Sequence, residues 1–173
     1  MNRLLLPLLL LPSAFALNAA ELSVQVEIPK LDVAEYHRPY VAIWIERADA
    51  SVAANLSVWY QRDKPDQRGE SGTKWLPDLR QWWRRSGRAL DLPVDGVTGA
   101  TRPAGSHRLV FSSTSEPLQS LEAGSYNLVV EAAREIGGRE LLKLPLLWPP
   151  ADAVQSSVEG SSELGRITLD ITP

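Results

Sequence analysis

The chain has 173 residues, a formal net charge of −3 and no cysteine, and its only methionine is Met1. The lack of cysteine excludes disulfides, iron–sulfur clusters, c-type haem attachment and thiolate metal sites. The mildly acidic balance gives no indication of nucleic-acid binding. The two histidines, His37 and His107, lie far apart in the sequence and belong to no ligand cluster, so we expect no metal site.

The first twenty residues have the pattern of a secretory signal peptide. Arg3 precedes an apolar run at 4–11 that is too short to span a bilayer, and small residues follow it. Cleavage could follow Ala16 or Ala20, and we favour Ala20. No other apolar run is long enough to cross a membrane. We therefore expect an exported, periplasmic protein that is not membrane-embedded.

The chain after the signal peptide, residues 21–173, is expected to form a single domain. Most of it alternates apolar and polar residues with the period of two that is typical of β-strands, and turn-forming residues separate the segments. Many short strands and one helical segment favour an all-β fold, an antiparallel immunoglobulin-like β-sandwich with one short capping helix. A jelly roll or a partly open barrel is also compatible with this pattern. The expected strands are residues 21–28, 40–46, 56–60, 107–111, 126–132, 140–147 and 166–171.

The helical segment is expected over residues 74–85. Pro77 and Asp78 suit a first helical turn. Leu79, Trp82 and Trp83 then follow with the i, i+3, i+4 spacing of one apolar stripe. We expect this short helix to cap one end of the sandwich.

Several other side chains carry expectations about burial. Trp44 and Trp59 lie in strand segments and are expected to fill the core of the sandwich. Glu131 and Glu135 are expected to face solvent. Residues 155–165, which are rich in Ser and Gly, are expected to form a loop before the last strand.

The segment at 95–101 reads Asp-Gly-Val-Thr-Gly-Ala-Thr. It resembles the attachment signal at which bacterial flavin transferases couple FMN, through its phosphate, to a threonine hydroxyl outside the cytoplasm. That signal consists of Asp, two variable residues, Ser or Thr, Gly, Ala, and a final Ser or Thr. The resemblance implies that Thr101 is the acceptor and that FMN is a covalent cofactor. The simpler interpretation is an unmodified surface turn, since Asp-Gly and Pro103 flank the segment.

The remaining fixed positions of the signal are Asp95, Thr98, Gly99 and Ala100, which the resemblance makes recognition elements for the transferase. Gly99 and Ala100 carry little bulk, which allows another enzyme to approach closely. An electron carrier built from this chain would need an organic cofactor, because cysteine and ligand-forming methionine are missing.

Nearly all of the mature chain is similar to an uncharacterised bacterial periplasmic domain-of-unknown-function family. The resemblance implies partnership with PepSY-domain membrane proteins and flavin transferases, in extracytoplasmic electron-transfer systems that are often linked to iron acquisition. The segments that carry it, besides the signal peptide, are Pro-Tyr-Val-Ala-Ile-Trp-Ile-Glu at 39–46, Lys-Trp-Leu-x-x-Leu at 74–79, Thr-Gly-Ala-Thr-Arg at 98–102 and Gly-x-Tyr at 124–126.

Two groups of side chains near the signal are candidates for contacts with the flavin. Arg102 is the best candidate to pair with the phosphate or the reduced ring, because guanidinium groups recognise phosphate well. Trp75, Trp82 and Trp83 either stack on the isoalloxazine ring, form a surface for a partner or attach the helix to the sheets. The other cations of this neighbourhood are Arg80, Arg84, Arg85 and Arg88.

Two hypotheses of function follow. In the first, the protein is a periplasmic redox carrier, not a catalyst, which takes electrons from a membrane donor and passes them to a periplasmic acceptor. In the second, it is an unmodified immunoglobulin-like binding or adaptor module that docks a partner through the Trp-rich helix. No nucleophile–base pair or carboxylate dyad indicates a hydrolase.

Overall fold

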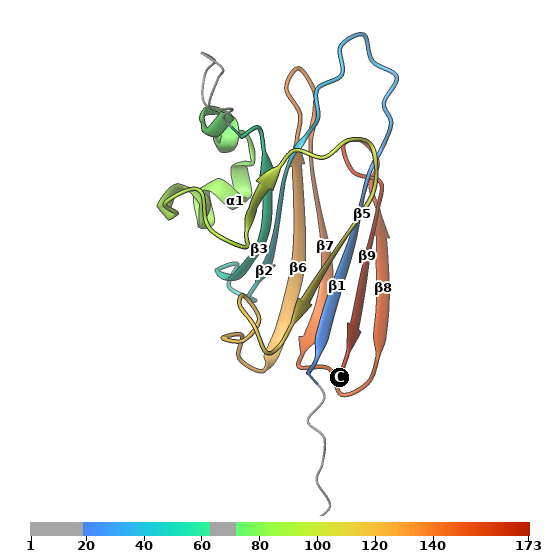
Figure 1. Cartoon of the computed structure of the whole chain (residues 1–173). Coiled ribbons are helices and arrows are strands. Elements are labelled where there is room, and N and C mark those ends of the chain that lie inside the picture. The colour runs from blue at the N-terminus through green and yellow to red at the C-terminus, as the bar shows by residue number, and fades with distance from the viewer. Residues whose placement is uncertain (1–18, 63–71) are drawn as a thin grey trace, which may run out of the picture.

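The computed structural model describes residues 19–62 and 72–173, so the expected signal peptide lies outside the described residues except for its last two positions. Two β-sheets stack face to face, and a helical layer covers the outer face of one of them (Figure 1). In the described part of the chain, no helix is both long and apolar enough to cross a bilayer.

The first sheet has the strand order β5-β1-β9-β8 and is antiparallel throughout. The expected all-β sandwich is confirmed, although β1 pairs with the last strand, whereas the first two strands pair in an immunoglobulin domain. The strands are β1 (Glu21–Ile28), β5 (Gly105–Ser112), β8 (Val154–Glu159) and β9 (Arg166–Thr172).

The second sheet has the order β4-β3-β2-β6-β7. All its pairs are antiparallel except β3 with β4, which run parallel. The strands are β2 (Tyr40–Glu46), β3 (Val52–Tyr60), β4 (Thr98–Ala100), β6 (Gly124–Ala133) and β7 (Arg139–Trp148).

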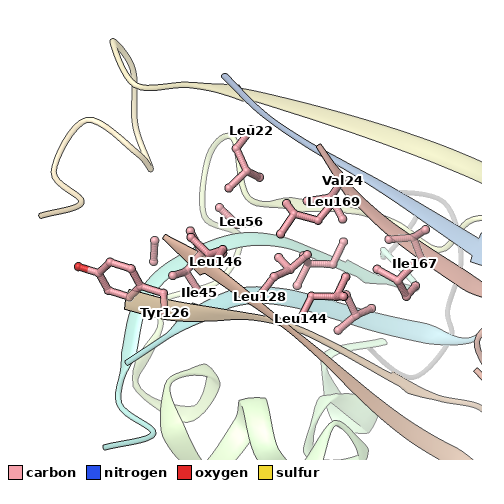
Figure 2. Packing of buried hydrophobic residues seen from close by; sticks show 14 of the residues in the cluster. Leu22, Val24, Ile45, Leu56, Tyr126, Leu128, Leu144, Leu146, Ile167 and Leu169 are labelled. Carbon is pink, nitrogen blue, oxygen red and sulfur yellow. The ribbon is translucent and has the colours of Figure 1, made fainter. Parts of the chain in front are cut away.

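The main core lies between the two sheets. Alternate residues of most strands point inward, as the period of two predicts, and on β1, β2, β3, β6, β7 and β9 most of these side chains are almost fully buried, whereas those of β5 and β8 are partly buried. Figure 2 shows them between the sheets, with the helical ribbon on the opposite side of the second sheet. The labelled members are Leu22, Val24, Ile45, Leu56, Tyr126, Leu128, Leu144, Leu146, Ile167 and Leu169.

A second apolar cluster lies between the second sheet and the helical layer. This layer consists of 3₁₀-helix η1 (Gly72–Asp78), helix α1 (Arg80–Arg85) and 3₁₀-helix η2 (Gly87–Ala89). Leu79 and Trp82 are fully buried against the sheet, as the predicted stripe requires. The helix therefore covers a face of the sandwich instead of capping an end. Trp44 was expected in the main core but packs between the second sheet and this helical layer, while Trp59 fills the main core as expected.

The expectation that Glu131 faces solvent is wrong. Its side chain is fully buried beneath α1 and accepts hydrogen bonds from the backbone N–H groups of Gln81 (3.1 Å) and Trp82 (2.9 Å). The Arg139 guanidinium donates a third, at 2.9 Å. Since Leu79 at the helix N-cap provides no side-chain hydrogen bond, the sheet supplies the cap through Glu131. Glu135 is exposed, as expected.

Two strands were missed by the sequence pattern. Residues 155–165 were expected to form a loop, yet most of β8 lies there and pairs with β9. β4 occupies positions 98–100, in the second half of the expected surface turn at 95–101. Both are edge strands, so each is held on one side only and needs less apolar alternation than a central strand.

Candidate functional site

Thr101 follows directly after β4, at the edge of the second sheet. The β3–β4 ladder pairs Val58, Trp59 and Tyr60 with residues 98–100, and the Thr101 N–H continues it by donating to the Tyr60 carbonyl at 3.2 Å. The Thr101 side chain is half-buried and makes no side-chain hydrogen bond with another described residue. Thr101 is thus fixed through its backbone, while its hydroxyl is unengaged within the described part of the chain.

The turn that leads into β4 is held by a few local hydrogen bonds. The Thr98 hydroxyl donates to the Val94 carbonyl at 2.9 Å, and the Thr98 N–H donates to the same oxygen at 3.0 Å. Gly96 has a φ of +72°, a conformation that favours glycine. Asp95 is exposed, and its carboxylate makes no hydrogen bond or ion pair with another described residue.

Gly99 and Ala100 are not required by the backbone at their positions. A Cβ added at Gly99 would lie 3.6 Å from Cδ1 of Trp59, an ordinary van der Waals contact, and its φ lies outside the left-handed region. Ala100 is exposed. The glycine that this turn needs is therefore Gly96, at a variable position of the attachment pattern, and not Gly99, at a fixed one.

A cavity of about 350 Å³ opens beside Thr101. It lies where the 29–39 loop, the end of β3, η1 and the β6–β7 hairpin meet, at the upper end of the sandwich in Figure 1. Its lining combines two arginines, two carboxylates, a histidine and two aromatic rings. The lining residues are His37, Arg38, Tyr40, Gln61, Arg62, Trp75, Asp78, Thr101, Ala133 and Glu135.

Some charged groups of the cavity have ion-pair partners among the described residues and others do not. His37 contacts Glu35 at 3.0 Å and Glu135 at 3.5 Å, which ties the 29–39 loop to the β6–β7 hairpin. Arg38 and Arg62 are exposed and form no hydrogen bond or ion pair with another described residue. The cavity thus presents two guanidinium groups whose donors are not engaged by any described residue.

The side chain of Arg102, which was predicted to pair with the flavin, lies outside the cavity that Thr101 lines. Its guanidinium lies 4.3 Å from the centre of the Trp59 ring, and His107 lies against the same ring at 5.8 Å. Burial lowers the pKa of Arg102. Because consecutive side chains of an extended segment alternate in direction, Thr101 lines the cavity while Arg102 stacks on Trp59.

The other predicted contacts are distributed between the cavity and the helical layer. Of the five arginines near the signal, at positions 80, 84, 85, 88 and 102, none lines the cavity. Arg85 pairs with Glu46, which also contacts Lys143 at 2.5 Å. Trp82 and Trp83 pack in the helical layer, so only Trp75 of the three tryptophans reaches the cavity.

The arginines of the cavity were missed by the sequence analysis. A signal for them exists, because Arg38 lies two residues before Tyr40, where β2 begins, and Arg62 lies two residues after Tyr60, where β3 ends. The antiparallel pairing of β2 with β3 brings the start of one strand beside the end of the other.

The comparisons with known proteins identify a family but no characterised relative. Neither a curated protein nor a solved structure matches the chain. One family model, described as a predicted periplasmic protein (DUF2271), matches residues 21–166. This match confirms the expected periplasmic location and the resemblance to an uncharacterised periplasmic family. The chain therefore belongs to the DUF2271 family of predicted periplasmic proteins.

Proposed function

We propose that this protein is a periplasmic electron carrier that holds FMN through a phosphodiester to the Thr101 hydroxyl. The observation that carries the proposal is the mismatch between the attachment pattern and the needs of the fold. Asp95, Gly99 and Ala100 match fixed positions of the pattern, although no contact or backbone conformation of the described structure requires them. A requirement from outside the fold, such as recognition by a flavin transferase, accounts for these residues.

The surroundings of Thr101 fit an FMN group. Thr101, whose hydroxyl no described residue engages, lines a cavity that also holds an accessible tryptophan and two arginines without a partner among residues 19–62 and 72–173. Cofactor sites commonly have volumes of roughly 300–1,000 Å³, and this cavity lies at the lower end of that range.

Attachment would be catalysed by the transferase, with a flavin dinucleotide as the donor. The Thr101 Oγ–P bond forms, the pyrophosphate P–O bond breaks, AMP leaves, and the hydroxyl proton passes to a base of the transferase. The attached FMN would then take up electrons from a membrane donor, for which a PepSY-domain protein is the proposed partner. It would pass them to a periplasmic acceptor in metal or iron reduction.

The test is the intact mass of the protein exported together with a flavin transferase, with in-gel flavin fluorescence after denaturation. We expect a mass gain of one FMN less one water. The gain should be lost in Thr101→Ala and retained in Thr101→Ser, since the pattern accepts serine. The matched control is Thr172→Ala, which changes an exposed threonine far along the sequence and should keep the full gain.

Gly99→Ala separates recognition from folding. Because the added Cβ meets only an ordinary contact with Trp59, we expect an unchanged melting temperature together with a marked loss of attachment. A wild-type protein of unmodified mass beside an active transferase would overturn the proposal. Full attachment to Thr101→Ala would overturn the assignment of the acceptor.

A further inference from the structure

The cavity beside Thr101 is assembled by the strand pairing that also places the acceptor. The β3–β4 ladder brings Thr101 to the end of β3, and the β2–β3 pair brings the start of β2 to the same place. Arg38 and Arg62 therefore flank the position that would carry the flavin, although 24 sequence positions separate them. Their approach to Thr101 therefore follows from the pairing of these strands.

The electrostatic character of the cavity favours a group with both anionic and polar edges. Asp78 and Glu135 also line it, so the cavity is not uniformly cationic. Glu135 is engaged with His37 at 3.5 Å, whereas Arg38 and Arg62 have no partner among the described residues. Guanidinium groups bind phosphate and planar heteroatom edges through two parallel hydrogen bonds.

The aromatic character of the cavity comes from η1 and β2. Trp75 is 41% exposed, which is unusual for a tryptophan, and Lys74 Nζ lies 5.1 Å from the centre of its ring. Tyr40 is fixed by an edge-on contact with Tyr60 at 6.4 Å and by donating its hydroxyl proton to the Gly72 carbonyl at 3.0 Å. One accessible ring and one immobilised ring therefore face the same space.

We propose that this cavity binds the isoalloxazine ring of the attached FMN, and we call it the cradle. Trp75 stacks on the ring, while Arg38 and Arg62 pair with the FMN phosphate and with the pyrimidine edge of the ring. The inference rests on the proposed flavin attachment and assigns the residues that bind the ring. When an external donor supplies two electrons and solvent supplies one proton, the reduced ring is an anion. Arg38 and Arg62 would stabilise that anion and so raise the reduction potential.

The first experiment measures binding of free FMN to the unmodified Thr101→Ala protein. Tryptophan fluorescence is followed during titration with FMN and, separately, with riboflavin, which lacks the phosphate. We expect FMN to bind more tightly than riboflavin. Arg38→Gln with Arg62→Gln should weaken FMN binding about tenfold, the loss of one charge-assisted contact or more. The matched control is Arg84→Gln with Arg88→Gln, which removes two positive charges outside the cavity and should bind as the parent does.

The second experiment uses the flavinylated protein and measures flavin fluorescence and midpoint potential with dithionite as reductant. Trp75→Leu should increase flavin fluorescence toward that of free FMN, since the stacked ring would be removed. The double Arg38→Gln, Arg62→Gln variant should shift the potential to more negative values, and the Arg84→Gln, Arg88→Gln control should leave it unchanged.

The outcomes separate the cradle from the attachment. Suppose that FMN is attached to Thr101 but the variants of Arg38, Arg62 and Trp75 change neither the midpoint potential nor the flavin fluorescence. That result would overturn the cradle and leave the attachment standing. An unmodified wild-type protein whose Thr101→Ala form still binds FMN through these residues would support the cradle and overturn the covalent carrier. Equal binding of FMN by the cavity variant and the control would overturn the cradle in either case.

Discussion

Replacing Glu131 by alanine should detach the helical layer from the second sheet. The carboxylate is fully buried and accepts hydrogen bonds from Gln81, Trp82 and Arg139 at 2.9–3.1 Å. The Arg139 side chain is 37% exposed and can be solvated without its partner, so most of the cost comes from the two helix N–H groups that lose their acceptor. Leaving a buried donor unsatisfied costs about 1–3 kcal/mol, so we expect Glu131→Ala to lose about 2–6 kcal/mol of unfolding free energy.

Urea unfolding at equilibrium, followed by far-ultraviolet circular dichroism and by tryptophan fluorescence, measures this loss. Glu131→Gln keeps the shape and one acceptor oxygen, so it should cost about half as much, since hydrogen bonds to charged groups contribute about 1.5–3 kcal/mol each. The control is Glu159→Ala, whose carboxylate pairs with Arg166 in solvent and should contribute less than about 1 kcal/mol. A Glu131→Ala protein within about 1 kcal/mol of wild type would refute the role of Glu131 as the helix cap.

Three further predictions concern other parts of the fold. Burial alone would raise the pKa of Glu140, but hydrogen bonds from the backbone N–H groups of residues 161, 162 and 164 lower it to about 2. Since the folded-state pKa lies below the ordinary value of 4.5, this stabilisation is present above pH 4.5 and is lost as the pH falls toward 2. Glu140→Gln should therefore lose about 1–2 kcal/mol in urea titrations at pH 7, after allowance for solvent screening, and the difference should vanish near pH 2. Gly87→Ala should cost about 1–3 kcal/mol in thermal unfolding, because the new Cβ would lie 2.5 Å from the buried Trp82 ring, and equal melting temperatures would contradict this. The sequence favours cleavage after Ala20, but Ala20 is 7% exposed in the main core and accepts a hydrogen bond from the Ser113 N–H at 2.8 Å. Because cleavage there would remove this residue, we now expect cleavage at the alternative site after Ala16, and N-terminal sequencing of the exported protein decides between the two.

The sequence was most informative where one physical rule acts alone. The strands at 21–28 and 40–46 have the predicted bounds, because alternation and flanking turn residues determine both ends. The helical layer was placed wrongly because Trp44 was expected to fill the core between the two sheets, whereas Ala42 and Trp44 face the helical layer. A strand that is apolar on both faces is covered on both faces, and this rule could have indicated the third layer.

The hypothesis that Thr101 is the acceptor comes from a short linear pattern, whereas the cavity beside Thr101 depends on pairing between β2, β3 and β4 and could not be predicted from the sequence. Three-residue β4 gives no periodic signal, and its parallel pairing with β3 is a long-range contact. The burial of Glu131 was hidden for a similar reason, since its partners lie 49 and 50 positions earlier in the chain. Alternation alone does not distinguish a solvated carboxylate from one that caps a helix.

The separation of the two apolar clusters has a consequence for cooperativity. The main core joins both sheets, while the second cluster depends on one face of the second sheet and a few short helical turns. Such a layer can open as an independent unit while the sandwich remains folded. Amides of η1 and α1 should then exchange with deuterium earlier than those of β1 and β9. Because η1 carries Trp75 and Asp78, this partial opening would widen the space around Thr101 without unfolding the sheet that holds it.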